Sequence, residues 1–169
     1  ISFDFRRVYT GFKDGVNARI GGSLLAVMNT ASEYGFGAII AALPGFAIIS
    51  HALGNTFTNP LVNGAVTTTV LAGVTGSASG GMSIALSAMA DQYNAAILAM
   101  GIPPEVMHRI VAMASGGMDT LPHNGAVITL LAVTGLTHKQ SYKDIFAITI
   151  IKTIAVFVAI AAFTWFGIV

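Results

Sequence analysis

The chain has 169 residues, of which 54% are hydrophobic and 9% are Asp, Glu, Lys or Arg, and its mean hydropathy is +0.77. Soluble domains carry roughly 25% charged residues, so this composition excludes a soluble domain and predicts an all-α integral membrane protein. The net charge of +1 argues against a nucleic-acid partner, and the lack of cysteine excludes disulfides and thiolate metal sites. No Asp, Glu, Lys or Arg occurs between Glu33 and Asp91.

The N-terminal segment is basic and is followed by three units of apolar arm, polar break and apolar arm. It carries Arg6, Arg7, Lys13 and Arg19 against Asp4 and Asp14. Positive residues favour the cytoplasmic side of a membrane, so we expect this segment there.

The first unit has apolar arms near 16–28 and 36–53 around a polar break at 29–35. A crossing needs ~20 residues at a rise of ~1.5 Å each, and the first arm is shorter than that. We therefore expect a re-entrant helical hairpin with its polar tip partway into the bilayer. Pro44 and Gly45 predict a kink in the return arm.

The second unit covers 59–100, with a break at 75–81 and two arms that are each long enough to cross. As one helix it would be ~60 Å long, so it must fold back or include an interfacial portion. The third unit follows Pro103 and Pro104, breaks at 115–125 and ends near Gly135. Its short arms, with basic residues at both ends, favour a hairpin.

The last segment, 145–169, is uninterrupted and long enough to span a bilayer, with Lys152 near its start. We expect Lys152 either to reach the interface or to face the protein interior. The pentapeptide Ala-Ser-Gly-Gly-Met occurs at 78–82 and again at 114–118, overlapping two of the breaks. Non-helical backbone at membrane depth is tolerated only when it is buried or lines a watery cavity. The breaks therefore indicate the interior of a transporter or channel.

Small polar residues in the breaks are suited to binding an anion, since hydroxyls and amides donate hydrogen bonds and helix N-termini favour negative charge. We expect glycine to let the substrate approach the backbone, although Gly80 and Gly81 equally suit tight helix packing. The candidate substrate ligands of the second and third breaks are Ser77, Ser79, Gly80, Gly81, Ser115, Gly116, Gly117, Thr120 and Asn124.

Three ionisable residues lie in the breaks: Glu33, Asp119 and His123. Each is costly at membrane depth without a role or partner, so each is a candidate for proton coupling. The alternative is that they lie in water at a loop, with Asp119 opening a helix near Pro122. We predict no metal site, because His108, His123 and His138 lack ligand spacing.

The third break resembles a known transporter family. The run from Met113 to Val127, followed by Leu136-Thr137-His138-Lys139, resembles the gluconate:proton symporter family, and 75–82 and 29–32 are similar to further segments of it. The resemblance implies a multi-pass secondary transporter of the bacterial inner membrane, in the ion transporter superfamily. Such proteins contain two inverted repeats with re-entrant hairpins and broken helices. Members carry gluconate and related hydroxy acids, or 3-hydroxybutyrate or D-serine, usually with protons and without a cofactor.

The resemblance also implies partners. Members have more than twice as many residues, so we expect 1–169 to be a single transmembrane domain, the C-terminal repeat of a longer transporter whose N-terminal half completes the site. A homodimer is expected from superfamily relatives, and sodium is the alternative coupling ion. Asn29 and Thr30, with nearby Ser32, resemble a superfamily hairpin tip that contacts substrate, although Met28 replaces the usual preceding serine.

Two other classes fit parts of the sequence. An intramembrane serine hydrolase would use Ser79 or Ser115 with His123, but both serines lack the Gly-x-Ser-Gly context. A non-transporting membrane subunit, or a channel, would use the glycines for packing and the polar runs as loops. We expect a transporter rather than an enzyme.

Overall fold

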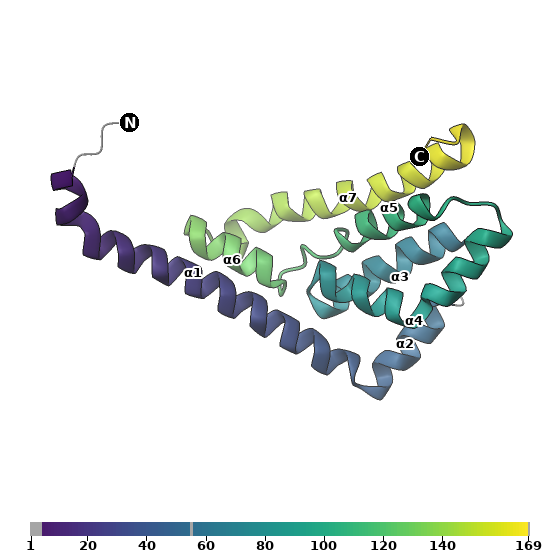
Figure 1. The fold of residues 1–169 in the computed structure, drawn as a ribbon, viewed down its shortest axis with the longest axis horizontal. Helices are drawn as coiled ribbons and strands as arrows, with labels where there is room; N and C mark the ends of the chain where they lie inside the picture. Colours follow the sequence, from purple (N-terminus) through teal and green to yellow (C-terminus); the bar gives the residue numbers. More distant parts are fainter. Residues whose placement is uncertain (1–4, 55, 169) are drawn as a thin grey trace.

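The computed structural model describes residues 5–54 and 56–168, which form helices joined by short connections (Figure 1). No strand occurs in these ranges. The helices are α1 (Phe5–Ala41), α2 (Pro44–Gly54), α3 (Pro60–Thr75), α4 (Ala78–Ala99), α5 (Pro104–Ser115), α6 (Gly125–Thr134) and α7 (His138–Phe166).

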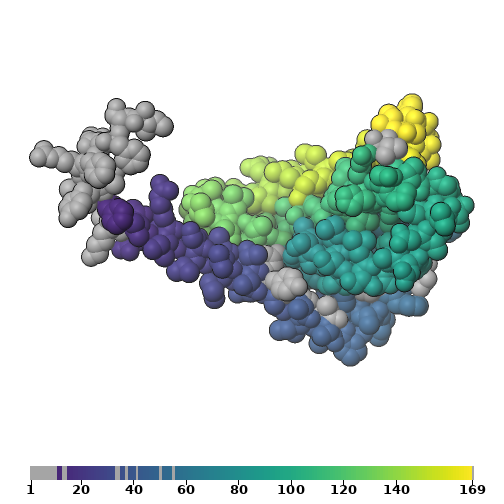
Figure 2. Space-filling view, in the orientation of Figure 1, coloured from purple at the N-terminus to yellow at the C-terminus, as the bar shows by residue number. Residues whose placement is uncertain are grey.

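Helix α1 runs without interruption through 29–35, so the break and re-entrant tip predicted there are wrong. The segment contains polar residues but no proline, and one glycine costs only about 1 kcal/mol in a helix. The chain turns later, at Ala42 and Leu43, because Pro44 disfavours helical backbone in the residue before it and then opens α2. Figure 2 shows the N-terminal part of α1 extending beyond the other helices, whereas Asn29 of the same helix contacts α6.

Helices α3 and α4 fold back on each other as a hairpin whose tip is Gly76 and Ser77, inside the segment 75–81. Asn59 caps the start of α3 by accepting from the backbone N–H groups of Leu61 and Val62. Ser77 caps α4 by accepting from Gly80 N at 3.2 Å. The sequence at the tip thus ends one helix and starts the next within two residues.

Helices α5 and α6 do not form the hairpin that their short arms predicted. They follow one another in the same direction, separated by the connection 116–124, and α7 returns alongside both (Figure 1). The contacts along α7 confirm this antiparallel arrangement, since its first half packs on α6 and its second half on α5. Ile145 contacts α6 at Val127 and Leu131, whereas Val156 and Ile160 belong to a core that contains α5. The third unit is therefore a helix broken in the middle, antiparallel to α7.

Helix α7 begins at His138, seven residues before the predicted boundary, because Thr137 and Gln140 cap it. The backbone N–H of Thr137 donates to Gln140 Oε1 at 2.9 Å. Among the described helices, α7 alone is long and apolar enough to cross a bilayer, with a hydropathy of 2.5 over its best window. The shorter helices α3 and α6 are also apolar.

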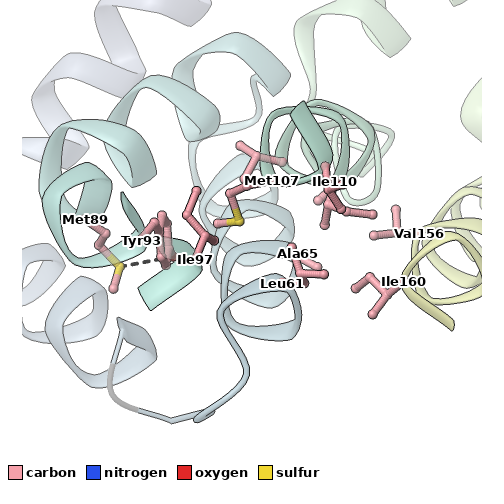
Figure 3. Close-up of a cluster of buried hydrophobic side chains, with 12 residues drawn as sticks. Leu61, Ala65, Met89, Tyr93, Ile97, Met107, Ile110, Val156 and Ile160 are labelled. Carbon is pink, nitrogen blue, oxygen red and sulfur yellow. Dashed lines mark hydrogen bonds between the residues drawn. The ribbon is translucent and has the colours of Figure 1, made fainter. Parts of the chain in front are cut away.

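The main core lies where α3, α4, α5 and α7 meet (Figure 3). Tyr93 is buried within it, and its hydroxyl donates to Asn63 Oδ1 at 3.0 Å. Asn63 in turn donates to the carbonyls of Leu53 and Gly54 that end α2. This core fixes the helices that carry the two breaks. Its buried members are Leu61, Ala65, Met89, Tyr93, Ile97, Val106, Met107, Ile110, Val111, Ala114, Val156 and Ile160.

Candidate functional site

The tip of the α3–α4 hairpin and the connection between α5 and α6 meet at one place. His123 Nε2 lies 2.9 Å from the carbonyl oxygen of Gly73, and Asn124 Nδ2 donates to the carbonyl of Gly76. A carbonyl only accepts, so Nε2 of His123 carries the hydrogen. These contacts join residues about fifty positions apart in the sequence, and they bring the second and third predicted breaks together.

Local conformation makes this meeting possible. Gly76 ends α3 in the left-handed region, with φ of 67°, where a residue with Cβ is strained. A Cβ there would also lie 3.1 Å from His123 Cδ2. Asn124 then starts α6, since its Oδ1 accepts from Ala126 N at 2.7 Å. One asparagine therefore caps α6 and holds the hairpin tip.

The two copies of Ala-Ser-Gly-Gly-Met pack against α3 from different helices. Gly81, in the first turn of α4, lies so close that a Cβ would be 2.2 Å from Ala72 N. Gly117, just after α5, would place a Cβ 2.9 Å from Thr69 Cγ2. The fourth residue of each copy is thus a packing glycine, which is the alternative considered for Gly81.

The first predicted break contributes Asn29 to the site, from within helix α1 rather than from a hairpin tip. Asn29 Nδ2 donates to Gly125 O and to Thr129 Oγ1, in the first turns of α6. Thr30 and Ser32 are exposed. The side chain of Glu33 lies outside the described residues.

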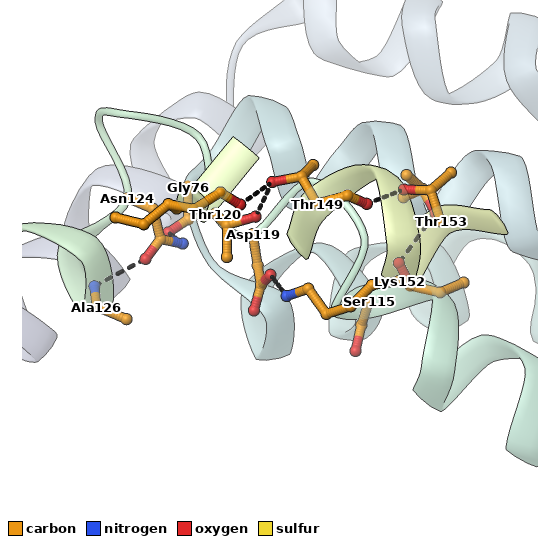
Figure 4. Close-up of polar contacts among 12 residues, drawn as sticks. Gly76, Ser115, Asp119, Thr120, Asn124, Ala126, Thr149, Lys152 and Thr153 are labelled. Carbon is orange, nitrogen blue, oxygen red and sulfur yellow. Dashed lines mark hydrogen bonds and ion pairs between the residues drawn. The ribbon is translucent and has the colours of Figure 1, made fainter. Parts of the chain in front are cut away.

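An ion pair lies beside the junction of the breaks. Lys152 Nζ of α7 is 2.7 Å from Asp119 Oδ1, and the two side chains are 33% and 24% exposed (Figure 4). The neighbouring residue Thr120 shares a hydrogen bond with Thr149, one turn before Lys152. The connection 116–124 is thereby attached to α7 by a charged and a neutral polar contact.

The remaining predicted substrate ligands differ in whether their polar groups already form hydrogen bonds within the protein. Ser115 is buried, and its hydroxyl donates to Ala112 O at 2.8 Å within its own helix. Ser77 is the cap of α4, and its hydroxyl lies 3.4 Å from that of exposed Ser79. A Cβ on Gly80 would meet Ser77, whereas one on Gly116 would be 3.9 Å from Lys152 Nζ.

The geometry does not assemble a serine nucleophile with a base. Within the described residues neither Ser79 nor Ser115 is hydrogen-bonded to His123, whose Nε2–H faces Gly73. His138 likewise uses Nε2 to reach the carbonyl of Pro122, at 2.9 Å. No cluster of three His, Asp or Glu side chains suited to a metal occurs in the described part of the chain.

A cavity between α4 and α5 lies outside both breaks. It encloses about 170 Å³ and is lined mainly by apolar residues, including Met82, Leu86, Tyr93 and Met107. It offers few polar groups that would recognise a charged substrate. The polar junction of the breaks is therefore the candidate functional site.

Lys152 and Thr149 are the site residues that sequence reasoning did not place. Thr149, Lys152 and Thr153 follow the i, i+3, i+4 spacing of one helix face in an otherwise apolar segment. That spacing, together with the isolated carboxylate of Asp119, could have indicated a buried polar face. The predicted start at 145 was too late, so Lys152 was interpreted as a residue near a helix end and this polar face was not recognised.

The fold and site together describe a helical membrane protein with a broken helix and a hairpin tip that meet at a polar junction. The chain is similar over all 169 residues to a protein named "Uncharacterized transporter YxjC" from Bacillus subtilis (strain 168), with 70% identity. It spans 36% of the length of that relative. No family model and no solved structure matches the chain. The likeness supports a transport function in general terms and agrees with the membrane character of the sequence.

Proposed function

We propose that the chain forms part of a secondary transporter that carries gluconate, or a related small hydroxy-carboxylate, together with protons across the bacterial inner membrane. The observation that carries this proposal is the meeting of the α3–α4 tip with the α5–α6 connection. Broken helices that converge within an apolar bundle expose backbone groups to a ligand, and transporters bind substrates at such points. The transporter relative and the sequence resemblance support the same class.

In this mechanism a hydroxy-carboxylate monoanion docks between the breaks. The hydroxyl groups of Ser77 and Ser79 have hydrogen-bonding capacity to offer to its carboxylate and hydroxyl groups. A proton on Asp119, Glu33 or His123 offsets the charge and leaves on the cytoplasmic side. Access alternates as the hairpin-bearing bundle moves against α7, and the rest of the transporter completes the site.

The test is uptake of radiolabelled gluconate by the full-length protein in proteoliposomes under an imposed proton gradient. Unlabelled 3-hydroxybutyrate and D-serine serve as competitors. We expect concentrative uptake that collapses when a protonophore dissipates the gradient, and the competition pattern then ranks the substrates. A sodium gradient in place of the proton gradient tests the alternative coupling ion. Folded protein that accumulates none of the three compounds would contradict the proposal.

A further inference from the structure

Lys152 is the middle residue of α7, with fourteen residues on either side of it within the helix. At ~1.5 Å per residue each end of α7 is ~21 Å away, and half of a bilayer's hydrocarbon core is only ~15 Å thick. With α7 centred in a bilayer, the backbone of Lys152 would lie ~15 Å from either surface, and its ammonium would be costly there without a partner inside the protein. The structure supplies Asp119, at 2.7 Å.

Among the described side chains, the pair is isolated from other charge. Helix α3 has no ionisable side chain, and those of α5 are Glu105, His108 and Arg109, at the end of the helix remote from the connection 116–124. On that connection the other titratable residue is His123, which faces Gly73. On α7 the charged residues of the described chain other than Lys152 lie in its first two turns. Asp119 and Lys152 therefore neutralise each other.

The pair is also accessible on one side. Both side chains are partly exposed, and Gly116 faces Lys152 without a side chain of its own. The position that a Cβ of residue 116 would take, 3.9 Å from Lys152 Nζ, is therefore unfilled beside the ammonium. A lysine ammonium has three N–H donors, so it can donate to the carboxylate of a ligand in place of the carboxylate of Asp119.

We propose that Lys152 binds the substrate's carboxylate and that Asp119 is the group that takes up the coupled proton. This inference rests on the transport function proposed above. In the empty site Lys152⁺ pairs with Asp119⁻. When one proton and one substrate monoanion enter, the proton converts Asp119 to the neutral acid and Lys152⁺ pairs with the substrate. Release of both restores the original pair, so the site, counted together with any bound substrate, carries no net charge in either state.

Electrostatics explains why the two ligands enter together. A monoanion added to the intact ion pair would leave one uncompensated negative charge among apolar helices, which is strongly unfavourable. A proton added alone would leave Lys152 without its partner at the middle of α7. Only the doubly loaded state and the empty state are neutral, and this gives a stoichiometry of one proton per monoanion.

The test compares variants of the full-length protein in proteoliposomes, with radiolabelled gluconate as the probe. Three quantities are measured: equilibrium binding against pH, exchange of labelled for unlabelled gluconate without a gradient, and accumulation driven by a proton gradient. Lys152→Met is expected to weaken binding about 10- to 100-fold and to abolish exchange, since a charge-assisted contact is lost. Asp119→Asn is expected to keep binding and exchange, to lose the pH dependence of binding, and to lose gradient-driven accumulation.

Two further variants separate function from folding. The double variant Asp119→Asn with Lys152→Met leaves no unpaired charge, so it is expected to fold and still to bind as weakly as Lys152→Met. Lys143→Met removes an exposed lysine from the same helix and is expected to leave all three quantities unchanged. A purely structural ion pair would lower exchange and accumulation together, without removing the pH dependence in Asp119→Asn.

The outcomes distinguish this inference from the function on which it rests. If wild-type protein neither binds nor accumulates gluconate, the proposed function fails and the inference fails with it. If wild-type protein accumulates gluconate while Lys152→Met binds it equally well, or Asp119→Asn still accumulates it on a proton gradient, the function stands and the roles given to the pair are overturned.

Discussion

At the scale of single residues, Gly76 shows how one backbone conformation positions two breaks. Its left-handed φ of 67° ends α3 and turns its carbonyl to Asn124, while the absence of a Cβ leaves room for the His123 ring. Gly101 has nearly the same φ, 65°, but nothing lies within 4 Å of its Cβ position. The two glycines share the conformational requirement and differ in the contact.

Substitution of these two glycines, Gly76 and Gly101, gives a matched prediction about stability. Gly76→Ala and Gly101→Ala should each lose about 1–2 kcal/mol from the left-handed conformation. Gly76→Ala should lose more, because its Cβ would lie 3.1 Å from a ring that the hydrogen bond to Gly73 holds in place. Thermal unfolding of the purified full-length protein in detergent measures both. Equal losses would mean that the His123 ring yields freely.

Residue identity also explains which site assignments could be made from sequence. Four site residues were recognisable from the sequence because polar residues cluster there within an apolar chain: Asp119, Thr120, His123 and Asn124. Their partners were not recognisable. Gly73 and Gly76 contribute only carbonyl oxygens, and Lys152 is 33 positions from Asp119 in the sequence. Contacts between residues so far apart in the sequence depend on how the helices pack, so they cannot be predicted from the local sequence pattern.

At the scale of elements, Asn124 shows how a helix cap can serve a second purpose. It accepts from Ala126 N, as a cap, and donates to Gly76 O, as a connection between breaks. Asn59 is the corresponding cap of α3, where Oδ1 accepts from Leu61 N and Val62 N. Both positions keep their cap when Asn becomes Asp, because either side chain supplies the oxygen.

Asn124→Asp should therefore destabilise the protein by about 1–3 kcal/mol, since buried Gly76 O loses its donor and meets a carboxylate instead. Asn59→Asp should be neutral or slightly stabilising, because negative charge is favourable at a helix N-terminus. Chemical denaturation of the two variants tests the difference. A loss of similar size in both would assign the effect to capping alone, and the connection between the breaks would contribute nothing.

Close approach of α4 to α3 makes a second prediction about elements. Gly81→Ala puts a Cβ against the backbone of Ala72, which cannot rotate away, so the hairpin must open. We expect a loss of about 1–3 kcal/mol. Gly22→Ala, in an exposed part of α1 with nothing within 4 Å, should instead gain up to about 1 kcal/mol in helix propensity. Unchanged thermal stability of Gly81→Ala would show that the α3–α4 packing adapts.

The helix boundaries also show that local composition predicts some of the helix breaks but not all of them. Helices stop at Thr75 and Ser115, inside segments where glycine and small polar residues predicted breaks. At 29–35 a similar density of polar residues is helical, because Asn29 finds its partners on α6 without leaving the helix. A break also does not specify the angle between its arms. Arms α3 and α4 fold back, whereas α5 and α6 continue, since α6 packs on α1 and α7 instead of α5.

At the scale of the whole molecule, charge and shape together suggest an orientation in the membrane. The start of α1 and the start of α7 lie toward the same end of the molecule (Figure 1). Basic residues occur at both, with Arg19 in the first half of α1 and Lys139 and Lys143 at the start of α7. The positive-inside tendency predicts that this end lies in the cytoplasm and that α7 crosses toward the outer face.

The chain contains no cysteine, so this orientation is testable by single-cysteine labelling in a full-length protein from which any cysteine outside residues 1–169 has been removed. Leu136→Cys should react with a membrane-impermeant maleimide only from the cytoplasmic side, and Trp165→Cys only from the outside. Ile151 is 65% exposed in the structure, yet Ile151→Cys should react from neither side, because lipid or the rest of the transporter covers it. Rapid labelling at 151 would contradict a transmembrane α7. It would also remove the reason for which Lys152 needs Asp119, since an ammonium in water is stable without a partner.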